Sequence, residues 1–426
     1  MIFRTASGLP VILRRADGTP ILSGGEEPGA GVRRHVASDV WRTGRVTQNR
    51  VPAQAVTYMT AHPAHAHGTD IQLTYGGNLP GGVTMPLAAA VEVGGRRVGA
   101  TFGGSSGAVL NGGTQTVSDP IDIEVNDGDE LRVYTYYGER SDGERHLAAP
   151  GCWYSNEILP GDQTLTGESR TSGSYDGAAG YFAPMPHSIT ALVAEDQRAW
   201  VLLGDSITES GSPGREVTPL ARQTASLTWA HRALADTPVC NTAMWGSAYA
   251  LGRDAHWATI PNLAPFTDAL VAWGYNDLDQ AWQVSSRDVA YVQKNAIAAW
   301  AWIGAGGPRV WQATVSPSTD STDGWASIEG QTPRAALPYR LAFNAWLRDG
   351  APIDGAAPAE VGDASAVRAG EAGHPLAGVI DQAARVESEP GSGVFRVDHG
   401  PLTADGGHPN AVGHDLMSEA LGTIQP

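Results

Sequence analysis

A serine directly follows an apolar run in the middle of the chain. The run 200–203, Trp-Val-Leu-Leu, is followed by Gly204, Asp205 and Ser206. A continuous apolar run predicts a buried strand, and open α/β sheets carry their chemistry at the carboxyl ends of such strands. Ser206 is therefore a candidate nucleophile. The alternative is that Asp205 and Ser206 only cap the next helix.

A serine nucleophile needs a general base within reach and a third group that orients the base. Near the end of the chain, Asp405 precedes His408 by three residues. This spacing can place the carboxylate beside the imidazole, where it would fix the tautomer and stabilise the imidazolium. Asp398 is an alternative candidate for the acid, and His399 and His414 are alternative candidates for the base. We consider all three weaker candidates than Asp405 and His408.

The same chemistry needs donors for a developing oxyanion. Gly246 follows the strand-like segment 238–244, and a glycine lets a backbone N–H approach a ligand closely. Asn276 follows the next apolar run, 268–274, so its amide is expected at the same sheet edge. With the N–H of Ser206 these groups would supply three donors. The alternatives are a plain turn at Gly246 and a helix cap at Asn276.

Composition excludes several classes of function. The 426 residues carry a net charge of −17, and Lys294 is the only lysine. Such a surface repels phosphate backbones, so we expect no nucleic-acid partner. We also expect no signal peptide and no membrane span, because the first residues lack an apolar core and no run approaches about eighteen apolar residues. Cys152 and Cys240 match no zinc spacing; we expect two unpaired thiols, with a single disulfide as the alternative.

The two halves of the chain differ in their hydrophobic period. Before residue 190 short alternating runs separated by glycine-rich turns predict an all-β sandwich or jelly roll. Its clearest piece is 121–137, where two alternating runs flank an Asn-Asp-Gly-Asp turn and predict a β-hairpin. Two sequence patterns in this half resemble a nucleophile motif and a metal site but do not meet the structural requirements of either. The G-x-S-x-G match around Ser105 lies between strands, and the histidines near 62–67 lack a standard metal spacing.

After residue 196 apolar runs alternate with helical patterns. We expect strands near 200–204, 238–244, 268–274 and 309–316, and helices over 219–236, 287–305, 337–349 and after Pro409. The segment 376–386 is expected to contain a short strand. Strands alternating with helices predict a parallel sheet with helices on both faces. We therefore place the domain boundary near residue 196, giving a sandwich domain over 1–196 and a catalytic domain over 197–426.

Four ordered blocks together resemble the SGNH (GDSL) hydrolase family. They are Gly204-Asp205-Ser206, Gly246, Gly274-Tyr275-Asn276-Asp277 and Asp405-Gly406-Gly407-His408. The resemblance covers 197–426 and implies a flavodoxin-like three-layer α/β/α fold. It also implies the roles already considered: Ser206 as nucleophile, His408 as base, Asp405 as orienting acid, and Ser206 N–H, Gly246 N–H and the Asn276 amide as oxyanion donors. A sandwich ahead of the catalytic domain resembles a bacterial subset of the family.

The expected activity is hydrolysis of short- to medium-chain acyl esters through an acyl-enzyme, without a metal or organic cofactor. O-acetylated carbohydrate is an attractive substrate on fold analogy. Trp245 and Tyr275 neighbour the expected oxyanion donors, so either could line the substrate pocket, although most such aromatics are packing residues. Two alternatives remain: a lysophospholipase or thioesterase acting on long acyl chains, and a glycan-binding module in which the sandwich is the working part.

Overall fold

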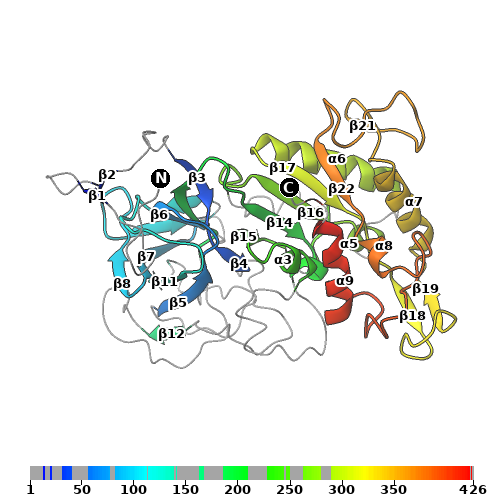
Figure 1. The fold of residues 1–426 in the computed structure, drawn as a ribbon, viewed down its shortest axis with the longest axis horizontal. Helices are drawn as coiled ribbons and strands as arrows, with labels where there is room; N and C mark the ends of the chain where they lie inside the picture. Colours follow the sequence, from blue (N-terminus) through cyan, green and yellow to red (C-terminus); the bar gives the residue numbers. More distant parts are fainter. Residues whose placement is uncertain are drawn as a thin grey trace.

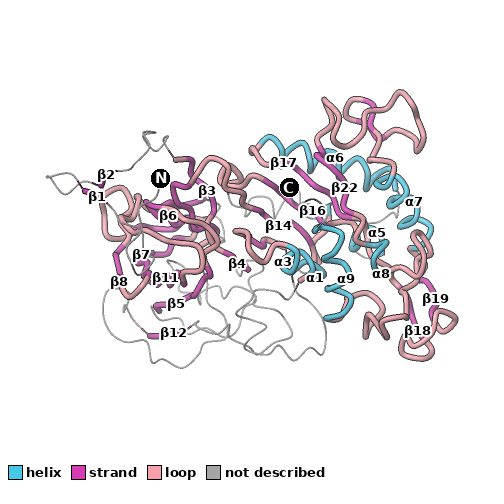
Figure 2. Tube along the Cα trace, in the orientation of Figure 1, coloured by secondary structure: helices cyan, strands magenta, loops and turns pink. Residues whose placement is uncertain are grey.

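The computed structural model of the chain describes residues 13–14, 20–21, 31–40, 56–76, 82–112, 114–138, 141, 163–166, 186–209, 228–243, 246–249, 262–279, 289–422 and 424. Figure 1 shows two regions side by side along the longest axis: the first half of the chain at one end and the second half at the other. Figure 2 shows that strands dominate the first region, whereas helices gather around the strands of the second.

Two antiparallel sheets make up most of the described part of the first half. In the first the strand order is β10-β6-β13-β3, with bounds Gln115–Val117, Thr69–Gly76, Ser188–Val193 and Val32–His35. In the second the order is β12-β5-β11-β7-β8, with bounds Gln163–Thr166, Val56–Pro63, Glu130–Tyr137, Thr84–Val93 and Arg96–Gly99; β9 (Ala108–Asn111) also pairs with β7. Buried side chains from both sheets, such as Leu73 and Val133, form one hydrophobic cluster. A short pair, β1 (Leu13–Arg14) and β2 (Pro20–Ile21), lies apart.

The hairpin predicted over 121–137 is wrong in its pairing. The turn is present, with the N–H of Asp129 donating to the carbonyl of Asn126 (3.0 Å). The residues before it do not pair with β11, however; Ile121 and Val125 form isolated bridges to Ile71 and Gly68 near β6. β11 pairs instead with β5 and β7. Alternation specifies which side chains are buried, but it does not specify the neighbouring strand.

The second half is built on a parallel sheet with the strand order β22-β17-β16-β14-β15-β4. Their bounds are Leu376–Ile380, Arg309–Ala313, Asp268–Ala272, Trp200–Gly204, Val239–Asn241 and Ser38–Val40. The strands expected near 200, 239, 268, 309 and 376 are therefore confirmed. Two antiparallel pairs lie outside this sheet: β18 (Thr319–Ser321) with β19 (Gln331–Pro333), and β20 (Ile353–Asp354) with β21 (Ala357–Pro358).

Seven helices accompany this sheet in the described part of the chain. They are α1 (Ser206–Glu209), α3 (Trp229–Ala233), α5 (Tyr275–Asp279), α6 (Val289–Ala305), α7 (Leu337–Arg348), α8 (Ala383–Val386) and α9 (Ala411–Gly422). The long helices expected at 287–305, 337–349 and after Pro409 are confirmed. Of the helix expected at 219–236, residues 219–227 lie outside the described residues. None of these helices is long and apolar enough to cross a bilayer.

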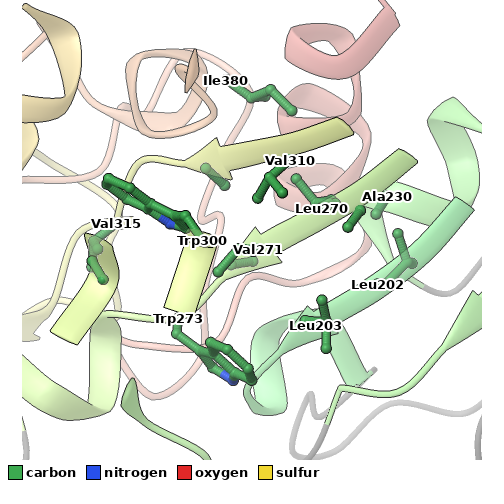
Figure 3. Close-up of a cluster of buried hydrophobic side chains, with 14 of the residues drawn as sticks. Leu202, Leu203, Ala230, Leu270, Val271, Trp273, Trp300, Val310, Val315 and Ile380 are labelled. Atoms are coloured by element: carbon green, nitrogen blue, oxygen red, sulfur yellow. The ribbon is translucent and has the colours of Figure 1, made fainter. Parts of the chain in front are cut away.

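The second hydrophobic core lies between the parallel sheet and its helices. Figure 3 shows Leu202, Leu270 and Val310 on three adjacent strands; of these, Val310 lies nearest to Trp300 of α6, and Leu202 lies beside Ala230 of α3. The ring of Trp300 stacks on Trp346 of α7 with centroids 5.6 Å apart. Because parallel strands are covered on both faces, their residues form continuous apolar runs, which is why these strands could be predicted from sequence.

A strand from the first half completes the parallel sheet. β4 pairs in parallel with β15, with Ser38 opposite Val239, and the N–H of Val239 also donates to the carbonyl of Ala37 (3.1 Å). Next to this strand, the N–H of His35 donates to the carbonyl of Pro265 (3.1 Å). The boundary expected near residue 196 stays a prediction, but the two halves are joined by backbone pairing as well as by side-chain packing.

Candidate active site

β14 delivers Ser206 to the carboxyl edge of the parallel sheet. The strand is buried along its whole length and ends at Gly204, where a side chain would collide with Thr208, whose nearest atoms lie 2.7 Å from the Cβ position. The next residue, Asp205, accepts the N–H of Ile207 on Oδ1 (3.0 Å) and the N–H of Thr208 on its carbonyl (3.1 Å). Ser206 therefore occupies the first position of α1, directly after the strand.

Ser206, His408 and Asp405 form a continuous hydrogen-bonded chain. The Oγ of Ser206 lies 2.8 Å from Nε2 of His408, and Nδ1 of His408 lies 2.7 Å from Oδ2 of Asp405. The other carboxylate oxygen, Oδ1 of Asp405, accepts the N–H groups of Gly407 (2.9 Å) and His408 (2.8 Å). The structure thus joins residues 202 positions apart in the arrangement that lets a histidine accept a serine proton.

The loop that carries the acid and base depends on two glycines. Gly406 has a φ of 80°, and a Cβ there would meet the backbone oxygen of Thr319. A Cβ at Gly407 would meet the hydroxyl of Tyr275. Since the loop passes this close to two other segments, the two residues between Asp405 and His408 must be small, which accounts physically for the Gly-Gly pair.

The expected oxyanion donors lie at the ends of the two strands that flank β14. β14 pairs with β15 on one side and with β16 on the other, where Gly204 lies opposite Ala272. Gly246, with a φ of 72°, follows β15, and Asn276 lies in α5 just after β16. The side-chain amide of Asn276 donates to the carbonyl of Ser247 (2.8 Å), so these two segments are in contact. An amide has two N–H donors, and this bond uses one.

Two carboxyl groups at this site have opposite pKa shifts. Burial alone would raise the pKa of Asp405, but its hydrogen bonds from the His408 side chain and from the N–H groups of His408 and Gly407 hold it well below the usual range. Burial raises the pKa of Asp205 to about 7, opposed by the Ile207 N–H and by charge interaction with His408. Asp405 is therefore an anion at neutral pH, as the orienting role requires.

Of the two aromatics expected near the substrate, one can be placed. Trp245 lies outside the described residues. Tyr275 is buried beneath Gly407, and its hydroxyl donates to Oγ of Ser318 (3.0 Å). Burial raises the pKa of Tyr275 further above its usual value. Its contact with the Asp405–His408 loop shows that Tyr275 supports this loop from below; its contact with a substrate stays a prediction.

Sequence reasoning missed Arg334, which ties the acid–base loop to the helix that carries Asn276. Its guanidinium donates to the backbone carbonyl of Asp405 (2.7 Å) and to Oδ1 of Asp320 (3.0 Å). It also lies 3.4 Å from Oγ of Ser318, which donates in turn to Asp279 of α5 (3.0 Å). No sequence signal marks Arg334, because its position becomes meaningful only once the chain around β18 and β19 is folded against the loop.

The other chemistry-bearing residues do not gather into a second site within the described ranges. His65 and His67 each face a different exposed acid, Asp127 at 4.0 Å and Glu124 at 3.8 Å. Among the described residues no three His, Cys, Asp or Glu side chains are grouped to hold a metal ion. Cys240 is buried, with its Sγ 3.1 Å from the carbonyl of His187, whereas Cys152 lies outside the described residues.

Comparison with known proteins gives structural likenesses only. No family model matches the chain, and no curated protein matches its sequence. Similar solved structures include a GDSL-like lipase from Bacteroides thetaiotaomicron (13% identity, 53% of this chain and 86% of that chain, TM-score 0.34). A lipase/acylhydrolase from Enterococcus faecalis is also similar (22% identity, 53% of this chain and 94% of that chain, TM-score 0.32). So is an acetylxylan esterase from Geobacillus stearothermophilus (11% identity, 52% of this chain and 91% of that chain, TM-score 0.34). Scores this low carry no functional argument.

Proposed function

We propose that this chain is a serine ester hydrolase of the SGNH (GDSL) type. The observation that carries the proposal is the relay Ser206 Oγ to His408 Nε2 (2.8 Å) and His408 Nδ1 to Asp405 Oδ2 (2.7 Å) at the carboxyl edge of a parallel sheet. Serine, histidine and carboxylate in this order activate the hydroxyl for attack on an acyl carbon. The matching fold proposal is a flavodoxin-like three-layer α/β/α domain preceded by a β-sandwich.

The reaction follows from the positions of the three side chains. His408 takes the hydroxyl proton as Ser206 Oγ bonds to the ester carbonyl carbon, and Asp405 stabilises the resulting imidazolium. His408 then gives that proton to the leaving alcohol as the ester C–O bond breaks, which leaves an acyl-serine. Water attacks this intermediate in the second half, again with His408 as base, and releases the acid and free Ser206.

The proposed oxyanion site combines the N–H groups of Ser206 and Gly246 with the Asn276 amide. Support comes from the register of β14, β15 and β16, whose neighbouring carboxyl ends carry these residues. The Asn276 amide is fixed by its bond to the Ser247 carbonyl, so its second N–H is already oriented. Donors held in place before the reaction need no reorganisation when charge develops on the carbonyl oxygen.

We further propose short- to medium-chain acyl esters, including O-acetyl groups on carbohydrate, as substrates. Lysophospholipids and long-chain thioesters are the competing substrates within the same mechanism. The net charge of −17 favours neutral substrates over anionic ones, because an acidic surface repels phosphate.

The test is hydrolysis of p-nitrophenyl acetate by the wild-type chain and by Ser206→Ala. We expect the variant to lose a factor on the order of 10⁴ to 10⁶ in turnover, because the remaining groups have no nucleophile to activate. Ser105→Ala is the matched control, since Ser105 is an exposed serine in the first half with a similar sequence context. Equal activity of Ser206→Ala and wild type would contradict the proposal, and so would an equal loss in Ser105→Ala.

A further inference from the structure

A tryptophan that sequence reasoning did not select lies against the acid–base loop. Trp325 belongs to the segment between β18 and β19, and a Cβ built on Gly406 would lie 3.0 Å from its Cζ2. The same segment is fastened to the loop by the backbone, since the N–H of Thr319 donates to the carbonyl of Gly406 (2.9 Å). The indole ring therefore contacts the acid–base loop at Gly406, two positions before His408 in the sequence.

The orientation of this ring is fixed by polar contacts. The indole N–H donates to Oγ1 of Thr319 (2.9 Å), and the backbone N–H of Trp325 donates to Oγ of Ser321 (2.7 Å). The side chain is half-buried, packed on one side against the core of the second half and exposed on the other. A rigid aromatic ring with one exposed part can contact a ligand at little cost in side-chain entropy.

The backbone at Trp325 is strained. Its φ is 62°, a left-handed conformation that bulky residues rarely adopt and that glycine adopts freely. The hydrogen bonds from Trp325 to Thr319 and Ser321 keep the residue in this conformation, which glycine would adopt without strain. Strain of this kind is concentrated at ligand-contacting positions, which points to a use for the ring itself.

The position of the Trp325 ring indicates which part of an ester substrate it would contact. In the proposed mechanism His408 must reach the oxygen of the leaving alcohol, so the alcohol lies on the side of the site where His408 stands. The acyl group extends instead from the carbonyl carbon that the oxyanion donors hold. Because Trp325 contacts the loop that carries His408, the alcohol is the part of the substrate on its side of the site.

The charges around Trp325 restrict the chemistry of that alcohol. Asp320 is an exposed carboxylate on the same segment. Both oxygens of Asp323 instead accept hydrogen bonds within the segment, from Ser321, Ala326 and Ser327. The guanidinium of Arg334 is engaged by Asp320 and by the carbonyl of Asp405. Carboxylates accept hydrogen bonds from hydroxyl groups and repel phosphates and uronates. An aromatic ring with the Asp320 carboxylate on the same segment suits a neutral sugar.

We propose that Trp325 forms an aromatic subsite for the neutral sugar ring that carries the ester group. This inference rests on the proposed ester hydrolase function and deepens it by assigning the residue that would bind the sugar ring. The apolar face of a pyranose would lie on the exposed part of the indole, with a sugar hydroxyl donating to Asp320.

The experiment compares two acetate esters that differ only in the alcohol: methyl 2-O-acetyl-β-D-glucopyranoside and ethyl acetate. Acetic acid release is followed for wild type, Trp325→Gly and Trp325→Phe. Glycine relieves the positive φ, so Trp325→Gly is expected to fold. Ile328→Ala is the matched control, because Ile328 is an exposed apolar residue on the same segment.

For Trp325→Gly we expect kcat/KM on the sugar ester to fall about fivefold to tenfold, mainly through KM, with ethyl acetate unchanged. Trp325→Phe should recover most of this loss, and Ile328→Ala should show none. The glucuronate counterpart of the sugar ester should be a poorer substrate for wild type. An equal loss on both acetates would show a structural role for Trp325, and no loss on the sugar ester would exclude the subsite.

A separate measurement distinguishes failure of the subsite from failure of the function. Binding of the same sugar ester to the Ser206→Ala chain can be followed by saturation-transfer NMR, which needs no turnover. Binding that weakens when Trp325→Gly is added supports the subsite even if wild type hydrolyses neither acetate. Binding that is absent, or unaffected by Trp325→Gly, overturns the subsite even if wild type is an active esterase.

Discussion

Asp205 is next to Ser206 in sequence, yet its carboxyl points into the protein. Oδ1 caps α1 through the Ile207 N–H, and no donor among the described residues reaches Oδ2. Burial raises the pKa of this group to about 7; the Asp277 carboxylate adds to the rise, and charge interaction with His408 opposes it. Above neutral pH the site therefore contains a buried anion whose ionisation costs folding free energy.

We predict that Asp205→Asn removes a pH-dependent loss of stability. Because its folded pKa is raised, the contribution of Asp205 is fully present below about pH 4 and is lost as the pH rises to about 7. Asn keeps an oxygen for the Ile207 N–H and does not ionise. Urea unfolding at about pH 5 and about pH 8 should show a drop in unfolding free energy for wild type that exceeds the drop for the variant, by up to about 3 kcal/mol.

The other shifted carboxyl group of the site, Asp405, does not contribute to this pH dependence. Its pKa is lowered, so its contribution to stability is present above its unfolded pKa of about 4 and is lost only as the pH falls further. Between about pH 5 and about pH 8 it stays ionised in both states and adds no slope. Identical pH profiles for wild type and Asp205→Asn would show that Asp205 does not titrate in this range.

At the scale of single residues, the sequence predicted the reactive side chains but not the residues that pack against them. Ser206, Asp405 and His408 could be predicted because few residue types perform this chemistry and each must follow a strand or precede a helix. The structure brings all three together. Arg334 and Trp325 could not be predicted, since arginine and tryptophan have many uses and their contacts with the loop exist only after long-range folding.

At the scale of elements, the segment from β18 to β19 and the acid–base loop act as one unit through Gly406. The carbonyl of Gly406 accepts the N–H of Thr319, and the Cβ position of Gly406 is blocked by Thr319 and Trp325. A side chain there must displace either the loop or the segment. Either movement would shift His408 relative to Ser206, and small displacements of reacting groups are costly in rate.

We predict that Gly406→Ala lowers esterase turnover by about 10²-fold. Gly355→Ala is the matched control, because Gly355 also has a positive φ (59° against 80°) but has open space around its Cβ position. Both variants carry the backbone strain of an alanine at positive φ, and only Gly406→Ala adds the collision. Measurement of kcat and of the thermal midpoint for both variants separates the two effects. Equal kcat for the two variants would contradict the prediction.

The predicted elements are correct where both faces of a strand are buried. The prediction is wrong where a strand pairs with partners far away in the sequence. β14 is a continuous apolar run of the kind that a parallel sheet requires, β16 and β17 are mainly apolar, and α6 has the length and composition of a core helix. The hairpin over 121–137 failed because the first of its two runs bridges to β6, and the second pairs with β5 and β7. Alternation is the same for any of these partners, so it could not select among them.

At the scale of the whole molecule, the two halves share a sheet. β4, at residues 38–40, lies at the edge of the parallel sheet beside β15, and its backbone pairing covers an edge that would otherwise be open. Unpaired sheet edges invite association with other chains. The loop 262–266 also packs on the first half, where Phe266 and His35 have ring centroids 5.3 Å apart.

We predict that a fragment of residues 197–426 is less stable than the same residues in the full chain and associates with itself. The fragment keeps Ser206, Asp405 and His408 but exposes the edge of β15 and the packing surface of Phe266. Size-exclusion chromatography and thermal unfolding of the fragment and the full chain provide the measurement. A monomeric fragment with the thermal midpoint of the full chain would show that β4 contributes nothing to the second half.

The place of β4 also has a consequence for synthesis on the ribosome. Residues 38–40 emerge early, but their partner strand β15, at residues 239–241, emerges about 200 residues later. At ordinary elongation rates that interval lasts about 10 to 40 s, during which β4 has no partner in its own sheet. The parallel sheet can therefore be completed only after β15 has been translated, and β4 must stay available to the nascent chain until then.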